Sequence, residues 1–245
     1  LTYWCKWFFM LWEEDDAQQE YKVPDTIVDL SYQIDCRQIA LDHAHDLSRA
    51  LHQALPWLAE EDDAGVHLIH GASSGNGWQR PDESSPEDFI YLSKRARMQL
   101  RVPRERIDDA HELTGQTLLV GEYTVEVGQA EVKPLTSLGT LFARYVPILP
   151  GEDEEAFLQR IVTEMRDMDV KVKKVLCGVG HAFQMPDGRV ETVSVMVADL
   201  DPKASVTLQQ KGIGEGRKHG FGLFIPHKGI KAVGEMSEKS HFAGT

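Results

Sequence analysis

Apolar and polar residues alternate along several short segments of the chain, and this period of two predicts half-buried strands. The first such segment covers residues 26–35, where four apolar side chains share one face: Val28, Leu30, Tyr32 and Ile34. Because Tyr32 lies on this apolar side, we interpret it as a core residue. Further segments that predict strands are residues 66–69, residues 89–102, and residues 116–132, which are long enough for two strands.

Two segments between these strands have the spacing of helices. A helix is expected to open at Asp42, a residue type that favours the N-cap, and its apolar residues recur on one face: Leu47, Ala50, Leu51, Ala54, Leu55 and Leu58. Residues 104–113 are predicted to form the second helix. The resulting order, strand–helix–strand–strand–helix–strand, is that of a ferredoxin-like domain.

The same order recurs after residue 140. The predicted elements are a strand at 141–148, a helix at 153–168, strands at 172–177 and 190–200, a short helix at 201–210, and a strand at 221–225. We therefore predict an α+β protein with two ferredoxin-like (RRM-like) domains in tandem and a C-terminal glycine-rich loop. The expected divisions are a partly flexible N-terminal extension (1–25), the two domains (26–138 and 139–234) and a C-terminal tail (235–245).

The glycine-rich loop is unlike an ordinary core element. Eleven residues hold five glycines, which are Gly212, Gly214, Gly216, Gly220 and Gly222. Such a backbone turns through positive φ angles and allows a large ligand to approach closely. The middle of the loop holds Arg217, Lys218 and His219. We expect its amides and cations to converge on phosphate groups.

Two nucleotide-binding motifs are excluded at this loop. A Walker A loop requires Lys-Ser or Lys-Thr after a glycine, and neither pair follows a glycine here. A Rossmann loop leads into a helix, whereas residues 223–226 are an apolar run that ends in proline and predicts a short strand. The remaining alternative is a glycine-rich turn between core elements.

The charge distribution limits the kind of ligand. The net charge of −13 argues against a general nucleic-acid binder, but cations gather at residues 94–106 and 211–231, which permits a specific basic groove on an acidic body. Three distant cysteines make disulfides and a thiolate zinc site unfavourable, so a reducing cytoplasm is the default. The apolar run in residues 1–12 is too short to span a membrane.

The pattern Gly-apolar-Gly, five residues, Gly-apolar-Gly resembles the glycine-rich loop of the CRISPR-associated RAMP superfamily. With the tandem domain order, residues 26–230 look like the sixth family of CRISPR-associated proteins, the endoribonucleases that cut precursor CRISPR RNA within each repeat. Shorter stretches, at residues 42–44, 67–77, 91–95 and 222–228, look similar to one branch of that family.

This resemblance implies metal-independent cleavage with no cofactor. The ribose 2′-hydroxyl attacks the adjacent phosphate, which leaves a 2′,3′-cyclic phosphate and a 5′-hydroxyl end. The implied partners are CRISPR repeat RNA and other CRISPR-associated subunits, and the implied location is the cytoplasm, away from membranes. The alternative within the superfamily is a non-catalytic subunit that binds CRISPR RNA in an interference complex.

The resemblance also points to catalytic residues. Many relatives place a catalytic histidine at the start of the first helix, and His43 stands there, where the positive end of the helix dipole favours the neutral imidazole that a general base needs. Arg49 occupies the position of a lysine that stabilises charge in some members, although arginine cannot donate the proton. His70, beside the glycine-containing loop 71–77, is a second candidate, and the general acid is left unassigned.

Other residues are candidates for RNA binding or alternative chemistry. Arg95, Arg97 and Arg101 share one face of the predicted strand and form a cationic track, with a solvated strand face as the alternative. Trp78 is a candidate for base stacking. His67 is expected to point away from His70, and His45 and His52 to lie on a solvated helix face. An HD metal phosphohydrolase site at His45-Asp46 is disfavoured because that class is helical.

Overall fold

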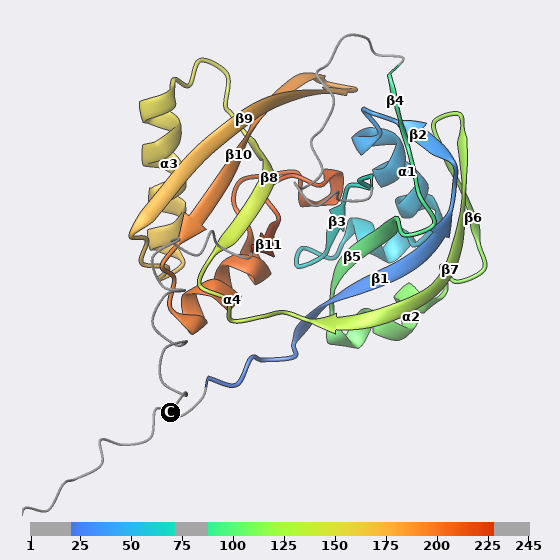
Figure 1. The fold of residues 1–245 in the computed structure, drawn as a ribbon, viewed down its shortest axis with the longest axis horizontal. Helices are drawn as coiled ribbons and strands as arrows, with labels where there is room; N and C mark the ends of the chain where they lie inside the picture. Colours follow the sequence, from blue (N-terminus) through green and yellow to red (C-terminus); the bar gives the residue numbers. More distant parts are fainter. Residues whose placement is uncertain (1–20, 72–87, 228–245) are drawn as a thin grey trace, which may run out of the picture.

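The computed structural model describes residues 21–71 and 88–227. Trp78, most of the loop 71–77, most of the N-terminal extension and the C-terminal tail lie outside the described residues. The two predicted ferredoxin-like units lie side by side, with β3 of the first and β11 of the second between them (Figure 1). No helix in the described part of the chain combines the length and the apolar content needed to cross a bilayer.

The N-terminal unit has the predicted order. Its elements are β1 (Ile27–Asp35), α1 (Ala44–Ala54), β3 (Gly65–His67), β5 (Arg97–Pro103), α2 (Ile107–His111), β6 (Thr117–Val120) and β7 (Tyr123–Pro134), with short 3₁₀ turns η1 (Pro56–Ala59) and η2 (Arg104–Arg106). The strands form an antiparallel sheet in the order β3-β5-β1-β7-β6. The first strand therefore lies inside the sheet, as a ferredoxin-like domain requires.

The predicted strand at residues 89–102 is in fact two strands. β4 (Phe89–Tyr91) leaves the main sheet and pairs with β2 (Gln38–Ala40) as a separate two-stranded ribbon, while β5 starts only at Arg97. Between them the amide of Ala96 donates to the carbonyl of Ser93 at 2.8 Å, which closes a tight turn. The predicted continuous face of arginines is therefore broken at this turn.

The C-terminal unit repeats the arrangement. Its elements are β8 (Leu141–Pro147), α3 (Glu154–Asp167), β9 (Lys174–Met185), β10 (Gly188–Ala198), α4 (Pro202–Lys211), the 3₁₀ turn η3 (Arg217–His219) and β11 (Phe224–Pro226). The antiparallel strand order is β11-β8-β10-β9. Aspartates cap both helices, because Asp153 accepts from the Ala156 amide and Asp201 from the Ala204 amide.

The predicted N-cap of the first helix is wrong by one residue. His43 occupies the N-cap of α1 and makes no side-chain capping bond, whereas the carboxylate of Asp42 accepts from the Gln184 amide at 2.6 Å. Gln184 belongs to β9 of the other unit. Asp42 therefore contributes to contact between the two units.

The two units share packing as well as polar contacts. Three rings from the C-terminal half, Tyr145, Phe183 and Phe221, belong to the hydrophobic core of the N-terminal unit. The ring centroids of Tyr145 and Phe183 are 4.9 Å apart, and those of Phe183 and Phe221 are 5.1 Å apart. A second core lies within the C-terminal unit, around Phe157 and Ile161. The interface is thus a continuation of the first core.

A buried ion pair of the N-terminal unit lies at the same interface. Arg101 on β5 has no exposed surface, and its guanidinium donates to both carboxylate oxygens of Asp29 on β1 at 2.8 and 2.9 Å. It also donates to the carbonyls of Gln209 and Phe224 in the other unit, at 2.6 and 3.0 Å. The prediction that Arg101 belongs to an exposed cationic track is wrong, because the second domain covers this polar face of the sheet.

The glycines of the loop adopt the predicted positive φ angles, from 66° to 88°. The requirement for glycine is strictest at Gly222, where a Cβ would lie 1.8 Å from the Ile213 carbonyl oxygen. This contact exists because the loop folds back on itself, with the Ile213 amide donating to the Gly222 carbonyl at 3.0 Å. Close approach of backbone to backbone, rather than to a ligand, explains this glycine.

Replacing Gly222 with alanine is expected to destabilise the protein by roughly 3 kcal/mol or more, because a strained φ and a backbone clash add together. Gly115→Ala is the matched control: its φ is +84°, but a Cβ there meets no atom within 4 Å. That variant should lose only about 1 kcal/mol. Urea unfolding of both variants measures the difference. Equal losses would contradict the close-approach explanation.

Candidate active site

The basic side chains of the glycine-rich loop point into the protein. The Arg217 guanidinium donates to the carbonyls of Gln210 at 2.7 Å and Asp63 at 2.9 Å, and the Lys218 ammonium reaches the Ala59 carbonyl at 2.5 Å. Desolvation by burial lowers the pKa of Arg217 to about 10. In this conformation these two cations hold the loop against the N-terminal unit, and phosphate binding by them stays a prediction.

The loop amides are also engaged within the protein. Gly214 donates to the carboxylate of Glu164 at 2.8 Å, and Gly222 donates to the Tyr145 carbonyl at 2.7 Å. Gly212 donates to Leu208, the C-terminal turn of α4. An amide that already donates to a carboxylate is not available for a phosphate oxygen. In this conformation the amides of Gly212, Gly214 and Gly222 therefore stabilise the loop itself, and the phosphate site expected on the loop stays a prediction.

A histidine cluster joins the loop to α1. The ring of His219 stacks on His45, with centroids 6.3 Å apart and planes 17° apart. Burial lowers the pKa of His219, and the nearby His45 and His52 lower it further. The helix face of His45 and His52 therefore meets the loop and is not the solvated face that we expected.

The His45-Asp46 pair does not have the geometry of a metal site. Asp46 pairs with Arg49 at 2.7 Å, while His45 faces the loop. Across residues 21–71 and 88–227, no three His, Cys, Asp or Glu side chains come together in a way that could hold a metal ion.

His43 is buried, with 2% of its surface exposed. The Ile69 amide donates to its Nε2 at 3.0 Å, and its Nδ1 lies 2.8 Å from the Ala40 carbonyl oxygen. These partners assign the proton to Nδ1, so the imidazole is neutral, as predicted. However, the Nε2 lone pair is already used. In this conformation His43 fixes the backbone beside His70 and does not present a base to a substrate.

Arg49 lies away from the groove described below. Its guanidinium pairs with Asp46 on an exposed part of α1, where 52% of the arginine side chain is accessible. Arg49 is not among the residues that line the groove. The structure therefore does not bring together Arg49 and His70, two of the predicted catalytic residues.

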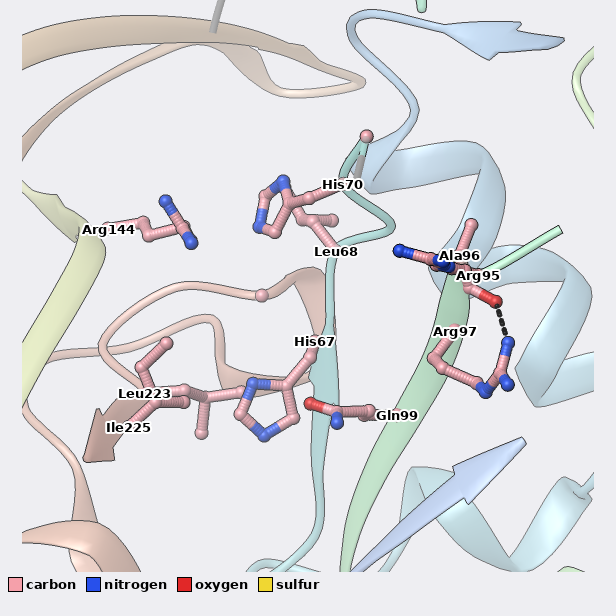
Figure 2. A pocket seen from close by; sticks show the side chains of 12 residues that line it. His67, Leu68, His70, Arg95, Ala96, Arg97, Gln99, Arg144, Leu223 and Ile225 are labelled. Carbon is pink, nitrogen blue, oxygen red and sulfur yellow. Dashed lines mark hydrogen bonds between the residues drawn. The ribbon is translucent and has the colours of Figure 1, made fainter. Parts of the chain in front are cut away.

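A pocket of about 280 Å³ lies between the two units, and we refer to it as the central groove (Figure 2). Two histidines and three arginines contribute to its walls: His67, His70, Arg95, Arg97 and Arg144. The glycine-rich loop contributes Gly220, and β11 contributes Ile225. The structure thus brings together His70, Arg95 and Arg97 of the predicted residues, and it adds His67 and Arg144.

Arg144 on β8 was not predicted from the sequence. Burial lowers the pKa of its guanidinium, and its Nε is buried without a hydrogen-bond partner. The guanidinium lies 5.7 Å from the Phe142 ring centroid, and no ion pair joins it to another described residue. An incompletely paired cation facing a pocket is a binding site for an anion. A single arginine in a strand gave no sequence signal of this role.

His67 and His70 line the same groove, although we expected opposite directions. β3 ends at His67, so the period of two does not extend to His70. His67 Nε2 lies 3.7 Å from Asp29, and desolvation by burial lowers the pKa of His67. The ring of His70 lies 5.9 Å from that of Tyr145. In Figure 2 both imidazoles stand on the same side of the β3 segment, toward Arg144 and β11.

Comparison with known proteins gives consistent results. The model of the Cas6 family, described as Cas6 Crispr, matches residues 28–229. The CRISPR-associated endonuclease Cas6 of Myxococcus xanthus (strain DK1622) is 27% identical over 199 residues, which cover 81% of each chain. Two solved structures share the fold: a CRISPR associated protein Cas6 (TM-score 0.53, 15% identity, 82% of this chain and 99% of that one) and a Cas6-related protein from Pyrococcus furiosus (TM-score 0.54, 11% identity, 81% and 98%).

Proposed function

The chain belongs to the Cas6 family of CRISPR-associated proteins, and from this premise we propose that it is a metal-independent endoribonuclease that cuts precursor CRISPR RNA within its repeats. The observation that carries the proposal is the central groove, where imidazoles and three arginines face one space. Cleavage of RNA by its own ribose needs a base, in-line alignment and compensation of phosphorane charge. The groove offers side chains suited to all three tasks.

We propose that His70 accepts the proton of the attacking 2′-hydroxyl. The 2′ oxygen then forms a bond to phosphorus, and the bond from phosphorus to the 5′ oxygen breaks. The 5′ oxygen takes up a proton from water as it leaves, so one product carries a 2′,3′-cyclic phosphate and the other a 5′-hydroxyl. A positioned imidazole in this role accelerates cleavage by about 10²–10⁴-fold.

The three arginines of the groove would neutralise the charge of the phosphorane. Arg144 approaches from β8 of one unit, whereas Arg95 lies just before β5 of the other unit and Arg97 at its start. One amine of Arg97 donates to the carbonyls of Lys94 and Ala96, so its remaining N–H groups would meet the phosphate. A phosphate between them would be contacted from two sides. Charge-assisted hydrogen bonds of this kind are stronger than neutral ones and fix the orientation of the phosphate.

We propose that His43 acts as a positioning residue. Its two hydrogen bonds tie Ala40 to Ile69, the residue immediately before His70. The helix-start histidine would therefore support the reaction by fixing the backbone from which His70 projects, without touching the RNA.

The domain boundary is proposed at residues 138 and 139, between β7 and β8. The connecting segment is bound to α4, because Gln209 donates to the Thr136 carbonyl at 2.6 Å and the Ser205 hydroxyl donates to the Leu138 carbonyl at 2.6 Å. These bonds favour a fixed connection between the units.

The proposed reaction predicts cleavage in the presence of EDTA. The substrate is an RNA copy of the CRISPR repeat from the genome that encodes the protein, and cleavage is expected at one bond. A 2′-deoxy substitution before that bond should abolish the cut, because the attacking hydroxyl is missing, while leaving binding intact. The ends are identified by mass spectrometry, which distinguishes a cyclic phosphate from a linear one.

Two outcomes would oppose this reaction. Loss of cleavage on addition of EDTA would contradict the metal-independent mechanism. Binding of the repeat RNA without any cut would favour the non-catalytic RAMP subunit, an alternative that the burial of His43 makes worth testing.

A further inference from the structure

Two large aromatic side chains lie exposed on the ribbon formed by β2 and β4. Phe89 is 42% exposed and Tyr91 is 75% exposed. Their rings meet edge to face, with centroids 5.1 Å apart and planes at 87°. Because the two residues are two apart on one strand, they project from the same face of the ribbon.

Within the described residues, the other face of the ribbon packs against the core of the N-terminal unit. Ile90 is buried and stands opposite Ile39, whereas Phe89 and Tyr91 stand opposite Ala40 and Gln38. A small and a polar residue therefore stand opposite the rings on the neighbouring strand, and neither adds a large apolar side chain to this face. The outer face of the ribbon is thus built around two rings that do not contribute to the core.

Cations border these rings in an otherwise acidic protein. The chain turns after Tyr91 into Lys94 and Arg95, both exposed, and Arg37 lies exposed beside the other strand, where its carbonyl accepts from the Leu92 amide at 2.9 Å. Lys94 lines a second pocket together with Asp35, whereas Arg95 lines the central groove. With a net charge of −13, this concentration of cations favours a polyanion.

The ribbon is continuous with the central groove. Arg95 lines the groove and follows Tyr91 by four residues, a separation of at most about 14 Å. A strand of RNA that passes from the groove over Arg95 therefore reaches Tyr91 within a few nucleotides. Aromatic rings beside cations are the usual site of contact with unpaired bases, which stack on the rings while the phosphates meet the cations.

We propose that Phe89 and Tyr91 form a stacking platform for unpaired bases of the RNA strand that runs out of the central groove. This inference rests on the proposed function for the nature of the strand. Tyr91 is the principal contact because more of its ring is accessible. The platform binds unpaired nucleotides with little regard to base identity, since every base has a face that can stack.

The test uses the repeat RNA with a 2′-deoxy substitution at the cut, and with 2-aminopurine placed in turn at each unpaired position. In the wild type, fluorescence at one or two of these positions should be quenched by stacking. In Phe89→Ala/Tyr91→Ala the quenching should disappear and affinity should fall about 10-fold, the usual scale for loss of base–aromatic stacking. Tyr91→Phe should behave like the wild type, because the ring is retained.

Leu119→Ala is the matched control, because Leu119 is 64% exposed on β6, outside the ribbon. It should bind as tightly as the wild type, and thermal unfolding should show all variants folded. Unchanged affinity and quenching in the double alanine variant would overturn the platform, as would an equal loss in Leu119→Ala. If the wild type neither binds nor cuts repeat RNA, the proposed function itself has failed.

Discussion

Replacing His70 with alanine is expected to slow cleavage of the repeat RNA by about 10²–10⁴-fold, the effect of removing a positioned general base. The imidazole lines the central groove that also holds three arginines, and no other histidine of the groove is placed in the same way, since His67 is directed toward Asp29. Binding should change little, because the arginines that contact phosphate remain. Single-turnover rates at saturating enzyme isolate the chemical step.

Three further variants, at two other histidines, make this prediction specific. His52→Ala should cleave at the wild-type rate, since His52 lies on α1 outside the groove. His43→Ala should lose rate through misplacement of Ile69, and His43→Gln should recover part of it, because an amide can both donate and accept. If His70→Ala cuts normally while both His43 variants are inactive, His43 is the base and the protein rearranges on binding RNA.

Replacing Arg101 with methionine is expected to cost about 3–5 kcal/mol of folding free energy, the loss found when one partner of a buried ion pair is removed. The carboxylate of Asp29 would lose two hydrogen bonds, and the carbonyls of Gln209 and Phe224 would each lose a donor. The double variant Asp29→Asn/Arg101→Met should be less destabilised than the single one, because no buried charge is left unpaired. Urea unfolding measures all three proteins.

The same pair predicts a dependence on pH. Burial would raise the pKa of Asp29, but Arg101 and His67 outweigh it and hold the pKa well below its usual value. A depressed folded-state pKa means that the stabilisation is complete above about pH 4 and is lost as the pH falls further. In Arg101→Met, protonation removes the unpaired charge of the Asp29 carboxylate. The loss in free energy of unfolding relative to the wild type should therefore be smaller at pH 4 than at pH 7. An equal loss of stability at both pH values would show that the charge pair is not the source of the destabilisation.

The sheets could be predicted because a period of two is a local property. Each strand carries its own alternation of apolar and polar residues, and the strand order follows once the helices are placed between them. The prediction failed at residues 89–102, where three consecutive polar residues, Ser93, Lys94 and Arg95, interrupt the alternation at the point where the backbone turns. Reading one strand through this interruption missed the boundary between β4 and β5.

The site was harder to predict because polar faces look alike in a sequence. Asp29 and Arg101 occupy the polar sides of their strands, and nothing in the alternation shows that a second domain covers them. The contacts of Arg217 and Lys218 with the N-terminal unit were unpredictable for the same reason, since a basic loop that binds a neighbouring domain has the composition of a phosphate-binding loop. The positive φ angles of the loop glycines were predictable, because glycine adopts them without the strain that a Cβ would bring.

The aromatic row from Tyr145 through Phe183 to Phe221 has a consequence for how this protein can be studied. Its rings originate in the C-terminal half but fill the core of the N-terminal half. Cutting the polypeptide between the halves would leave a cavity in the core of the N-terminal fragment. The C-terminal fragment would expose the same aromatic side chains to solvent. Dissection into separately expressed pieces is therefore a poor strategy, and single-residue changes in the intact chain are the better one.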